Sequence, residues 1–441
     1  MHKKRLLIRF LRFCLTGIIN TFLHVLIFAY LLQLSVHYLI CQSIAFFIVN
    51  MITFAINKYW TFGNRDPKLG RQLLLNYLGR FVTLAISLIF TYLLVEYLSV
   101  TPLLSQIYIV FINVALNFII SEIFIFKPVP KEKEYYLDIS RTKFENIVLS
   151  SKITIFFVVP VYKEQNRLYP KSQENPKGED FLRVKVNQIK ELMKWNKEFS
   201  WRLIFIDDND TKYHSGQLIK DYTLKVFPEL MENGSVQVWF LHELAPDIAV
   251  NSQKGGAVIT ALNNLDSIGF AENDIAIYTD ADISSDLRFT GILIYPLFKG
   301  YDISISSRWH KESTVVNRGV KENISSWLYN IIIYLFLQLD FSDTQNGFKA
   351  FKMASLKQIL PFAKEYNFAF DTELLMLSVL FKQKISEEPI FWEDSSSETN
   401  VNLLRDPIRM VNSLRKQSVR KSKILKEIKK KFSEEKTLTI I

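Results

Sequence analysis

Asp280 and Asp282 stand one residue apart, directly after an apolar run at residues 275–279. If that run is a strand, alternate side chains point to the same side, so both carboxylates are able to reach one cation. Carboxylates that share an ion with phosphate oxygens are typical ligands of Mg²⁺ and Mn²⁺. A lone Asp-x-Asp also fits a solvated acidic turn, since short motifs arise often by chance. The metal interpretation therefore depends on what accompanies the motif.

Other polar residues follow apolar runs in the same way. Runs at 153–159, 205–206 and 236–241 are rich in β-branched and aromatic residues, and helical stretches separate them. This alternation predicts a right-handed, mostly parallel sheet, whose ligands bind at the C-terminal edge of the strands. Val161-Tyr162-Lys163-Glu164 ends the first run, Asp207-Asp208-Asn209-Asp210 follows the second, and Gln253-Lys254-Gly255-Gly256-Ala257 opens the helix after the third.

The segment from about residue 150 to 410 resembles glycosyltransferase family 2, and within it the dolichyl- or polyprenyl-phosphate sugar synthases. The resemblance rests on ordered motifs rather than on one. These motifs are Val159-Pro160-Val161-Tyr162-Lys163-Glu164, Ile206-Asp207-Asp208, Asp280-Ala281-Asp282, Asp343-Thr344-Gln345-Asn346-Gly347-Phe348-Lys349 and Phe370-Asp371-Thr372-Glu373-Leu374-Leu375. The resemblance implies a GT-A (Rossmann-like) α/β catalytic domain that inverts the anomeric carbon.

The resemblance also implies a role for each motif. The residues expected to bind the nucleotide-sugar donor are Pro160, Tyr162, Glu164, Asp207, Asp208 and Lys254. Asp280 and Asp282 would hold Mg²⁺ or Mn²⁺, and the expected catalytic residues are Asp280, Asp282, Asp343 and Gln345. Arg308, Arg318 and Lys349 would bind the phosphate of the acceptor.

Three departures from the family pattern affect this assignment. Ser284 stands where the family often has a glutamine, which leaves a third protein ligand of the metal open. Lys349 replaces a common arginine and keeps the charge without the bidentate geometry. The Gln-x-x-Arg-Trp signature of processive polysaccharide synthases is absent, because Ser307-Arg308-Trp309 lacks the glutamine. A polymerising enzyme is therefore disfavoured.

The N-terminal part of the chain is apolar. Of the 441 residues 49% are hydrophobic, and four long apolar stretches lie at about 13–32, 38–56, 81–98 and 103–126. Each approaches the length that crosses a bilayer, and four in succession favour membrane spans over buried core helices. Basic residues precede the first stretch, separate the second from the third and follow the fourth, whereas 33–37 and 96–101 contain neither Lys nor Arg. The positive-inside rule thus predicts a cytoplasmic N-terminus and a cytoplasmic catalytic domain.

The membrane part repeats itself, since residues 54–62 align with 118–126 and share aromatic residues at both ends. Two hairpins that each end in an aromatic belt would explain the repeat. The segment resembles the GtrA-like four-span family, whose members are linked to moving or presenting lipid-linked sugars; a simple anchor is the alternative. Candidate polar contacts inside the bundle are Asn20, Asn50, Asn57, Asn113, Asn117 and Glu122.

The sequence therefore predicts a GtrA-like transmembrane domain at 1–130, a linker at 131–150, the catalytic domain at 151–400 and a basic tail at 401–441. With a formal net charge of +10 and four spans nearby, the tail fits an amphipathic helix on anionic lipid better than a nucleic-acid-binding segment. Residues 324–339 are apolar but too short to span, and predict a helix at the membrane interface that guides a lipid acceptor.

The predicted function is transfer of a sugar from a nucleotide-sugar donor, of GDP-mannose or UDP-glucose type, to a polyprenyl phosphate at the cytoplasmic face. The product would be a lipid-linked sugar for cell-surface glycan or protein glycosylation. Two alternatives stay open. One is a flippase or transport subunit with a non-catalytic sugar-nucleotide-binding half, and the other is a glycosyltransferase that acts on protein or glycan. A homo-oligomer is also compatible with the sequence.

Overall fold

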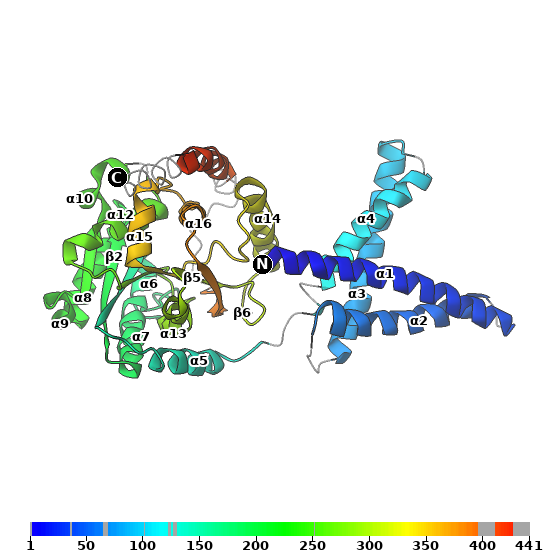
Figure 1. Ribbon diagram of the computed structural model, residues 1–441, viewed down its shortest axis with the longest axis horizontal. Coiled ribbons are helices and arrows are strands. Elements are labelled where there is room, and N and C mark those ends of the chain that lie inside the picture. Colours follow the sequence, from blue (N-terminus) through cyan, green and yellow to red (C-terminus); the bar gives the residue numbers. More distant parts are fainter. Residues whose placement is uncertain are drawn as a thin grey trace, which may run out of the picture. The chain divides into compact units, whose positions relative to one another are not determined.

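The computed structural model describes residues 2–35, 38–64, 69–100, 102–121, 125–126, 130–250, 252–395 and 411–426. The chain divides into two compact units, Met1–Val129 and Pro130–Ile441. Figure 1 shows a helical N-terminal unit and a C-terminal unit in which helices surround a sheet.

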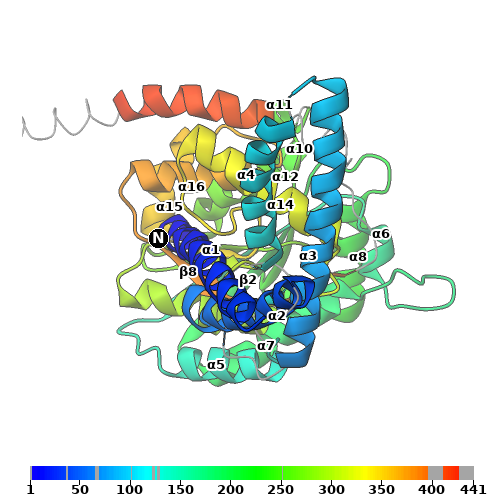
Figure 2. The ribbon, with the colours of Figure 1, turned by 90° about the vertical axis from the view of Figure 1, so that its right-hand side faces the viewer.

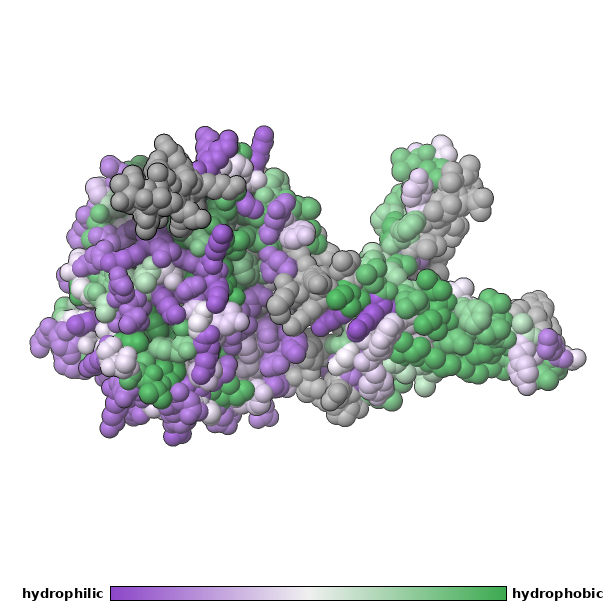
Figure 3. All heavy atoms as spheres, viewed as in Figure 1, coloured by the Kyte–Doolittle hydropathy of each residue, from purple (hydrophilic) through white to green (hydrophobic). Residues whose placement is uncertain are grey.

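The N-terminal unit is built from helices. Its elements are α1 (His2–Gln33), α2 (Tyr38–Ile56), η1 (Asn57–Thr61), α3 (Leu69–Tyr92), η2 (Leu93–Tyr97) and α4 (Pro102–Ile120). α1 packs along α2 and α3 along α4 (Figure 2). Apolar side chains cover much of the visible surface of α1 and α2 (Figure 3), as expected of helices that face lipid.

Only one segment in the described part of the chain, Ile8–Leu31 of α1, is both long and apolar enough to cross a membrane. α4 contributes a shorter apolar stretch, Phe111–Ile120. The number of spans and their orientation therefore remain predictions.

The sequence repeat corresponds to a structural repeat. The Phe62 N–H donates to the Asn57 carbonyl at 2.9 Å, and the Phe126 N–H donates to the Ser121 carbonyl at the same distance. Both bonds skip five residues, the π-helical pattern, and they fall at equivalent positions of the two copies. Phe62 and Phe126 stack with ring centroids 4.7 Å apart. The matched phenylalanines thus form a shared core between the copies, whereas the sequence predicted aromatic belts at the membrane face.

The C-terminal unit contains a seven-stranded sheet in the order β3-β2-β1-β4-β7-β5-β8 and a two-stranded sheet of β6 and β9. β7 alone among the seven strands runs antiparallel to its neighbours. The mostly parallel α/β sheet predicted from the sequence is confirmed. The strands are β1 (Ile153–Val161), β2 (Phe199–Asp207), β3 (Val236–Phe240), β4 (Ile275–Tyr278), β5 (Ile303–Ser307), β6 (Thr314–Val316), β7 (Lys349–Lys352), β8 (Ile385–Pro389) and β9 (Phe391–Glu393).

Helices cover both faces of the large sheet (Figure 1). Strand β1 explains why, because Phe157 and Val159 enter one hydrophobic core while Phe156 and Val158 enter the other. The helices are α5 (Lys133–Glu145), α6 (Gln165–Leu168), α7 (Phe181–Trp195), α8 (Ser215–Val226), α9 (Pro228–Glu232), α10 (Leu241–Leu244), α11 (Pro246–Ala249), α12 (Lys254–Asn263), η4 (Asn264–Ile268), η5 (Leu287–Phe289), α13 (Thr290–Ile294), η6 (Tyr295–Lys299), α14 (Val320–Leu337), α15 (Met353–Ile359), η7 (Leu360–Phe362) and α16 (Phe370–Leu380).

Helix α5 corrects the predicted linker at 131–150. Tyr136 and Phe144 of this helix are buried in the same core as β1. The Ser140 hydroxyl donates to the Arg288 carbonyl at 2.5 Å, which fixes the helix to the loop that follows the predicted metal motif. The segment is therefore a packed part of the α/β unit.

A helix at 411–426 gives the basic tail a defined position within the same unit. Its Leu414 and Ile424 are buried in the second core, and the Gln417 amide donates to the Ala369 carbonyl at 3.0 Å. The Lys421 ammonium donates to the Leu337 carbonyl at 2.7 Å, at the last residue of α14. One face of the helix thus packs on protein, while the opposite face presents the exposed residues Arg415, Lys416, Lys423 and Lys426.

Candidate active site

Asp280 and Asp282 lie just beyond the end of β4, as predicted, and both are partly accessible. The Asp280 carboxylate pairs with the ammonium of Lys254, the first residue of α12. Burial would raise the pKa of Asp280, but Lys254 and then Lys185 outweigh burial, so the pKa lies below its ordinary value. Lys254 is thus held beside the acids by charge.

Asp282 is the less neutralised of the two acids. In the described part of the chain no ion pair involves its carboxylate, which accepts the Ser284 N–H at 3.1 Å. Burial, and then the neighbouring charge of Asp280, raise the pKa of Asp282. The fully buried Lys185 of α7 donates to the Asp282 carbonyl at 2.8 Å and partly offsets this charge. A cation bound here would relieve the repulsion between the acids.

Two carboxylates on one turn fit a divalent metal, provided that other ligands complete its shell. The side chain of Ser284 does not point to the acids, because its hydroxyl lies 3.4 Å from the Ser395 hydroxyl and accepts the Ser395 N–H. No cluster of three His, Cys, Asp or Glu side chains with metal-binding geometry occurs among the described residues. The remaining ligands would therefore come from phosphate oxygens and water.

The 343–349 motif packs directly against Asp280. A Cβ on Gly347 would lie 2.3 Å from the Asp280 Oδ2 and 2.6 Å from its Cγ, closer than any van der Waals contact allows. Only glycine lets the backbone approach the carboxylate so closely. The neighbouring Asn346 and Phe348 fix the loop, because the Asn346 amide donates to the Ser306 hydroxyl and that hydroxyl donates to the Phe348 carbonyl, both at 2.7 Å.

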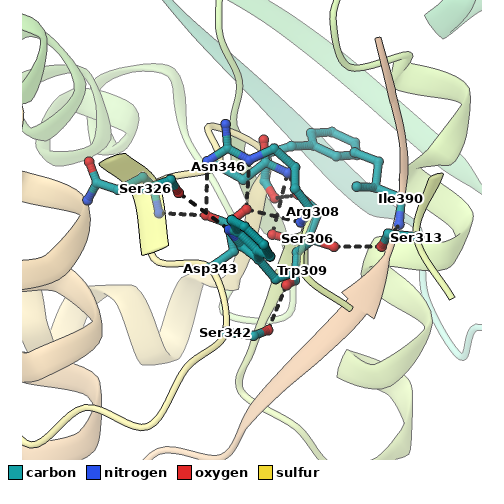
Figure 4. Close-up of polar contacts among 12 residues, drawn as sticks. Ser306, Arg308, Trp309, Ser313, Ser326, Ser342, Asp343, Asn346 and Ile390 are labelled. Atoms are coloured by element: carbon teal, nitrogen blue, oxygen red, sulfur yellow. Dashed lines mark hydrogen bonds and ion pairs between the residues drawn. The ribbon is translucent and has the colours of Figure 1, made fainter. Parts of the chain in front are cut away.

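Asp343, the first residue of this motif, pairs with Arg308 (Figure 4). The Arg308 Nε and Nη2 donate to the two Asp343 oxygens at 2.7 and 3.0 Å, and the backbone N–H groups of Arg308 and Gln345 complete the set. Burial would raise the pKa of Asp343, but Arg308 outweighs it and lowers this pKa to about 2. The geometry therefore makes Asp343 a positioning residue for Arg308, and the predicted catalytic contact with substrate is not supported. Gln345 is half-buried, and its amide donates to the Thr372 hydroxyl at 3.2 Å.

Arg318 lies close to two aromatic rings. Its guanidinium carbon lies 5.9 Å from the ring centroids of both Trp309 and Trp392, and Arg308 lies 5.5 Å from the Trp392 ring. Among the described residues no carboxylate is within ion-pair distance of Arg318. Burial, and then repulsion from Arg308, lower its pKa to about 10. Arg318 is therefore a charged group that an anion would stabilise.

Lys349 does not reach this anion site, contrary to the prediction. Its side chain is 0% exposed, and the ammonium donates to the Asp371 carboxylate and to the Asn346 carbonyl, both at 2.5 Å. The Tyr278 hydroxyl donates to the same Asp371 carboxylate. Burial raises the pKa of Asp371 to about 8 and lowers that of Lys349 well below its usual range. Lys349 thus fixes the end of the 343–349 loop by bonding Asn346 within it and Asp371 of α16.

The two acids of the predicted donor side differ: Asp207 bonds backbone N–H groups through both oxygens, whereas Asp208 keeps one oxygen without a partner among the described residues. Both Asp207 oxygens accept backbone N–H groups, from Gly216 at 3.1 Å and from Asp210 at 3.2 Å, so this carboxylate caps the start of α8 rather than facing a ligand. Asp208 is only 9% exposed, and its Oδ1 has no hydrogen-bond partner among the described residues. Burial raises the pKa of Asp208 to about 7. An unsatisfied buried acceptor of this kind marks a place where a ligand hydroxyl or N–H would bind.

The other predicted donor contacts lie around the end of β1. Pro160 belongs to the strand, and Tyr162 is exposed immediately after it, with the Lys163 ammonium 4.7 Å from its ring centroid. Glu164 is buried 3.4 Å from Arg167, and burial raises its pKa to about 7 despite that arginine. The charge of Asp282 also acts on Glu164, so the end of β1 and the metal motif share one electrostatic environment.

Lys185, Trp309 and Trp392 were not predicted from the sequence to belong to the site. Lys185 was detectable, because it occupies a position of the apolar stripe of α7 otherwise filled by Phe181, Leu182, Val186 and Ile189. Trp392 left no local signal, since β9 brings it to Arg308 and Arg318 from a distant part of the chain.

Comparison with known proteins finds one matching family and several related sequences. Residues 12–126 match the family described as GtrA/DPMS, transmembrane domain. Glycosyltransferase AglD of Haloferax volcanii is 32% identical over 32% of this chain, and the dolichyl-phosphate beta-glucosyltransferases of Saccharomyces cerevisiae and Drosophila melanogaster are 25% and 24% identical over 48% and 61% of it. The chain spans 22%, 63% and 78% of the lengths of these three relatives.

The Drosophila alignment reaches the α/β unit, because the N-terminal unit ends at Val129 and 61% of the 441 residues is more than twice that length. A crystal structure of glucosyl-3-phosphoglycerate synthase from Mycobacterium tuberculosis matches 65% of this chain and 83% of its own, with 14% identity and a TM-score of 0.42. The sequence similarities confirm the resemblance that the motifs predicted.

Proposed function

We propose that this chain, which joins a GtrA/DPMS-type transmembrane domain to a glycosyltransferase-like α/β unit, transfers a sugar from a nucleotide-sugar donor to a polyprenyl phosphate at the cytoplasmic face of a membrane. The observation that carries the proposal is a pair of charged side chains without ion-pair partners among the described residues. Asp282 lacks an ion-pair partner on the metal side, and Arg318 lacks one on the anion side, among the described residues. A metal-bound diphosphate and an acceptor phosphate would supply the two missing counter-charges.

Three described residues on the donor side support a nucleotide ligand. Asp208 offers a buried acceptor oxygen, Tyr162 offers an exposed ring, and Lys254 lies beside Asp280 with a cation for the diphosphate. Together they suit a hydroxyl or N–H donor, a flat base and a phosphate, which are all groups of a nucleoside diphosphate sugar. Whether the donor is of GDP-mannose or UDP-glucose type is part of the proposal to be tested.

Asp280 and Asp282 would hold Mg²⁺ or Mn²⁺, which stabilises negative charge on the leaving nucleoside diphosphate. The acceptor phosphate has a second pKa near 6 and is largely dianionic at neutral pH, so no strong general base is required. Arg318, close to Trp309 and Trp392, would then orient the phosphate oxygen for attack. Arg308 would add positive charge near this phosphate, and its ion pair with Asp343 fixes its position.

A lipid acceptor requires that the α/β unit meet the bilayer, and α14 offers a surface for that contact. Leu335 is 71% exposed, and Tyr334 and Phe336 beside it are exposed as well. The basic face of the 411–426 helix lies close by, because Lys421 bonds the end of α14. Apolar side chains flanked by lysines suit insertion at an anionic membrane surface. The proposed interface therefore comprises both helices.

The test is an incubation of membranes containing the full chain with a panel of radiolabelled nucleotide sugars and a polyprenyl phosphate. We expect label to move into an organic-extractable, heat-stable product with one or two donors, and to require Mg²⁺ or Mn²⁺. An Asp282→Asn chain serves as the control and should give no product. Label that stays water-soluble with every donor would refute the proposal.

A transport role with a non-catalytic α/β unit predicts a different result. In that case no donor would be transferred or hydrolysed, although the nucleotide sugar would still bind. Transfer of label to protein or glycan, with none in the organic phase, would instead favour the other class of acceptor.

A further inference from the structure

Glu373 of α16 is a buried acid that the proposed transfer reaction does not use. Its side chain is 0% exposed, and one carboxylate oxygen accepts the backbone N–H groups of Lys364 at 2.8 Å and of Glu365 at 2.6 Å. The other oxygen pairs with the guanidinium of Arg420, which belongs to the helix at 411–426. A buried carboxylate is costly unless it is paired and hydrogen-bonded, and Glu373 meets both conditions. Glu373 therefore ties the helix at 411–426 to the backbone that precedes α16.

The backbone that precedes α16, residues 363–369, forms neither a helix nor a strand. Side-chain hydrogen bonds hold it in place instead, and several of them come from the helix at 411–426. The Glu365 carboxylate accepts the Ser413 hydroxyl at 3.2 Å and the Gln417 amide at 3.4 Å, both from that helix. Ser413 and Gln417 are buried, so water competes little for these bonds. The position of the 363–369 segment thus depends on a helix from a distant part of the chain.

The 363–369 segment also contacts the start of α12. The Tyr366 carbonyl accepts the N–H groups of Gln253 and Gly256, both at 3.0 Å. Because N–H groups at the start of a helix lack partners within the helix, this carbonyl acts as a cap. A Cβ on Gly255 would lie 2.8 Å from the Glu365 carbonyl oxygen, closer than van der Waals contact allows, so only glycine permits this approach. The start of α12 is therefore fixed to the segment.

Lys254 is the first residue of α12 and lies within this contact. Its ammonium pairs with Asp280 and lies 5.9 Å from the centroid of the Phe370 ring. Phe370 directly follows the 363–369 segment and begins α16. The segment thus borders both the backbone and the side chain of Lys254. A continuous series of contacts runs from the helix at 411–426, through this segment, to Lys254 and the metal motif.

We propose that Glu373 and Arg420 are positioning residues for Lys254. The helix that carries Arg420 thereby forms part of the donor side of the active site. The assignment of Lys254 to the donor diphosphate rests on the proposed function, whereas its position beside Asp280 is observed. Loss of the Arg420 charge would leave Glu373 buried without its cation, which is costly, so the segment before α16 would shift to hydrate the acid. Lys254 would then move away from Asp280.

The direct test follows Lys254 by trace acetylation of the purified full chain in nanodiscs, with modified lysines quantified by mass spectrometry. Lys254 reacts slowly while Asp280 holds its ammonium, and it should react faster once the pair is broken. We expect Arg420→Gln to raise the acetylation rate of Lys254 about fivefold, the effect of breaking a partly exposed ion pair. Arg420→Lys, which keeps the charge, should stay close to the parental rate. Lys143→Gln is the matched control and should leave Lys254 unchanged, because Lys143 and Arg420 are similarly exposed, 29% and 26%, and each pairs with an acid.

A general loosening of the fold would give a different pattern. Lys185 and Lys349 are fully buried and should stay unreactive in Arg420→Gln, because the effect is confined to Lys254. Unchanged acetylation of Lys254, or a rise shared by Lys185 and Lys349, would overturn the proposal. If Arg420→Gln is too unstable to purify, Gln417→Met takes its place, since it removes amide bonds to the segment without altering charge. An unchanged rate at Lys254 in that variant would overturn the proposal in the same way.

Under the proposed function, the same change should also separate the two substrates. Arg420→Gln should raise the KM for the nucleotide sugar about fivefold and leave the KM for polyprenyl phosphate unchanged. The effect on the donor KM should vanish in a Lys254→Met chain, where no lysine is present to be displaced. A displaced Lys254 with an unchanged donor KM would refute its place on the donor side.

The inference and the proposed function fail in different ways. If the parent chain transfers no sugar from any donor, yet acetylation of Lys254 depends on Arg420, the transfer proposal fails and the positioning role stands. If the parent chain transfers sugar while acetylation of Lys254 is independent of Arg420, the transfer proposal stands and the positioning role fails.

Discussion

Replacing Gly347 by alanine is the sharpest perturbation of the predicted metal site that leaves its acids in place. The added Cβ would sit 2.3 Å from the Asp280 Oδ2, more than an ångström inside an ordinary contact of about 3.4 Å. The loop has little freedom to retreat, since Asn346 and Phe348 on either side are buried and hydrogen-bonded to Ser306. The Asp280 carboxylate must therefore move by about 1 Å.

A displacement of about 1 Å at a reacting centre costs on the order of a hundredfold in rate. We expect Gly347→Ala to lower kcat/KM for sugar transfer by about that factor and to weaken Mn²⁺ binding, measured by the electron paramagnetic resonance of free Mn²⁺. Gly319→Ala is the matched control, because a Cβ there would meet only Glu322 at 3.7 Å or more. That variant should bind Mn²⁺ and transfer sugar normally.

Thermal unfolding of both variants should be followed alongside the activity. A large fall in the unfolding midpoint of Gly347→Ala would mean that the loop itself, and not the position of Asp280, had been lost. Near-parental transfer and Mn²⁺ affinity in Gly347→Ala would refute the idea that this loop fixes the carboxylate.

Four further outcomes follow from the charges of the site. Asp282→Asn should reduce transfer about a hundredfold or more at saturating Mn²⁺ without loss of membrane insertion, as judged by extraction with carbonate. Arg318→Ala should raise the KM for polyprenyl phosphate about ten- to a hundredfold, the equivalent of roughly 1.5–3 kcal/mol, with the donor KM unchanged. Arg308→Ala should also lower the unfolding free energy by about 3–5 kcal/mol, because it leaves Asp343 buried without its cation. If denaturant titrations give Arg308→Ala and Arg318→Ala equal stability, the structural role assigned to Arg308 alone is wrong. Burial raises the pKa of Asp208 from 3.8 to about 7, so between these pH values the folded state binds a proton that the unfolded state has released, and the stability of the fold decreases as the pH rises from 3.8 to about 7. Asp208→Asn should therefore raise the melting temperature at pH 8 but not at pH 4, as thermal melts at both values would show.

The strand ends were predictable because their signals are local. A buried parallel strand needs a continuous apolar run, so the polar residue that ends it is conspicuous, as Asp280 is after β4. The same signal was misleading at Asp207, where the carboxylate follows a strand but caps the next helix. Asx caps and ligand contacts use the same residue type at the same place, and only the backbone N–H groups nearby distinguish them.

The ion pairs beneath the site were not predictable, because each joins distant parts of the chain. Arg308 and Asp343 are 35 positions apart, and Lys349 meets Asp371 only because β7 enters the sheet antiparallel, next to β4. A motif shows that these residue types are present, but the side to which each one points is set by tertiary packing. The packed helix α5 was a different failure, since Tyr136, Ser140 and Phe144 recur every four residues and did carry a helical signal.

The pairing of charges explains why so many ionisable residues are compatible with one small site. Lys254 pairs with Asp280 and Arg308 pairs with Asp343, while Lys349 and Asp371 bond to each other in a buried environment that shifts both pKa values toward the neutral forms. Such buried pairs contribute little net stability, but removal of one partner is costly, which keeps the site rigid. Asp282 and Arg318 are left without an ion-pair partner among the described residues. Under the proposed function, Asp282 would attract a metal-bound diphosphate and Arg318 a free phosphate, and the sugar to be transferred would lie between them.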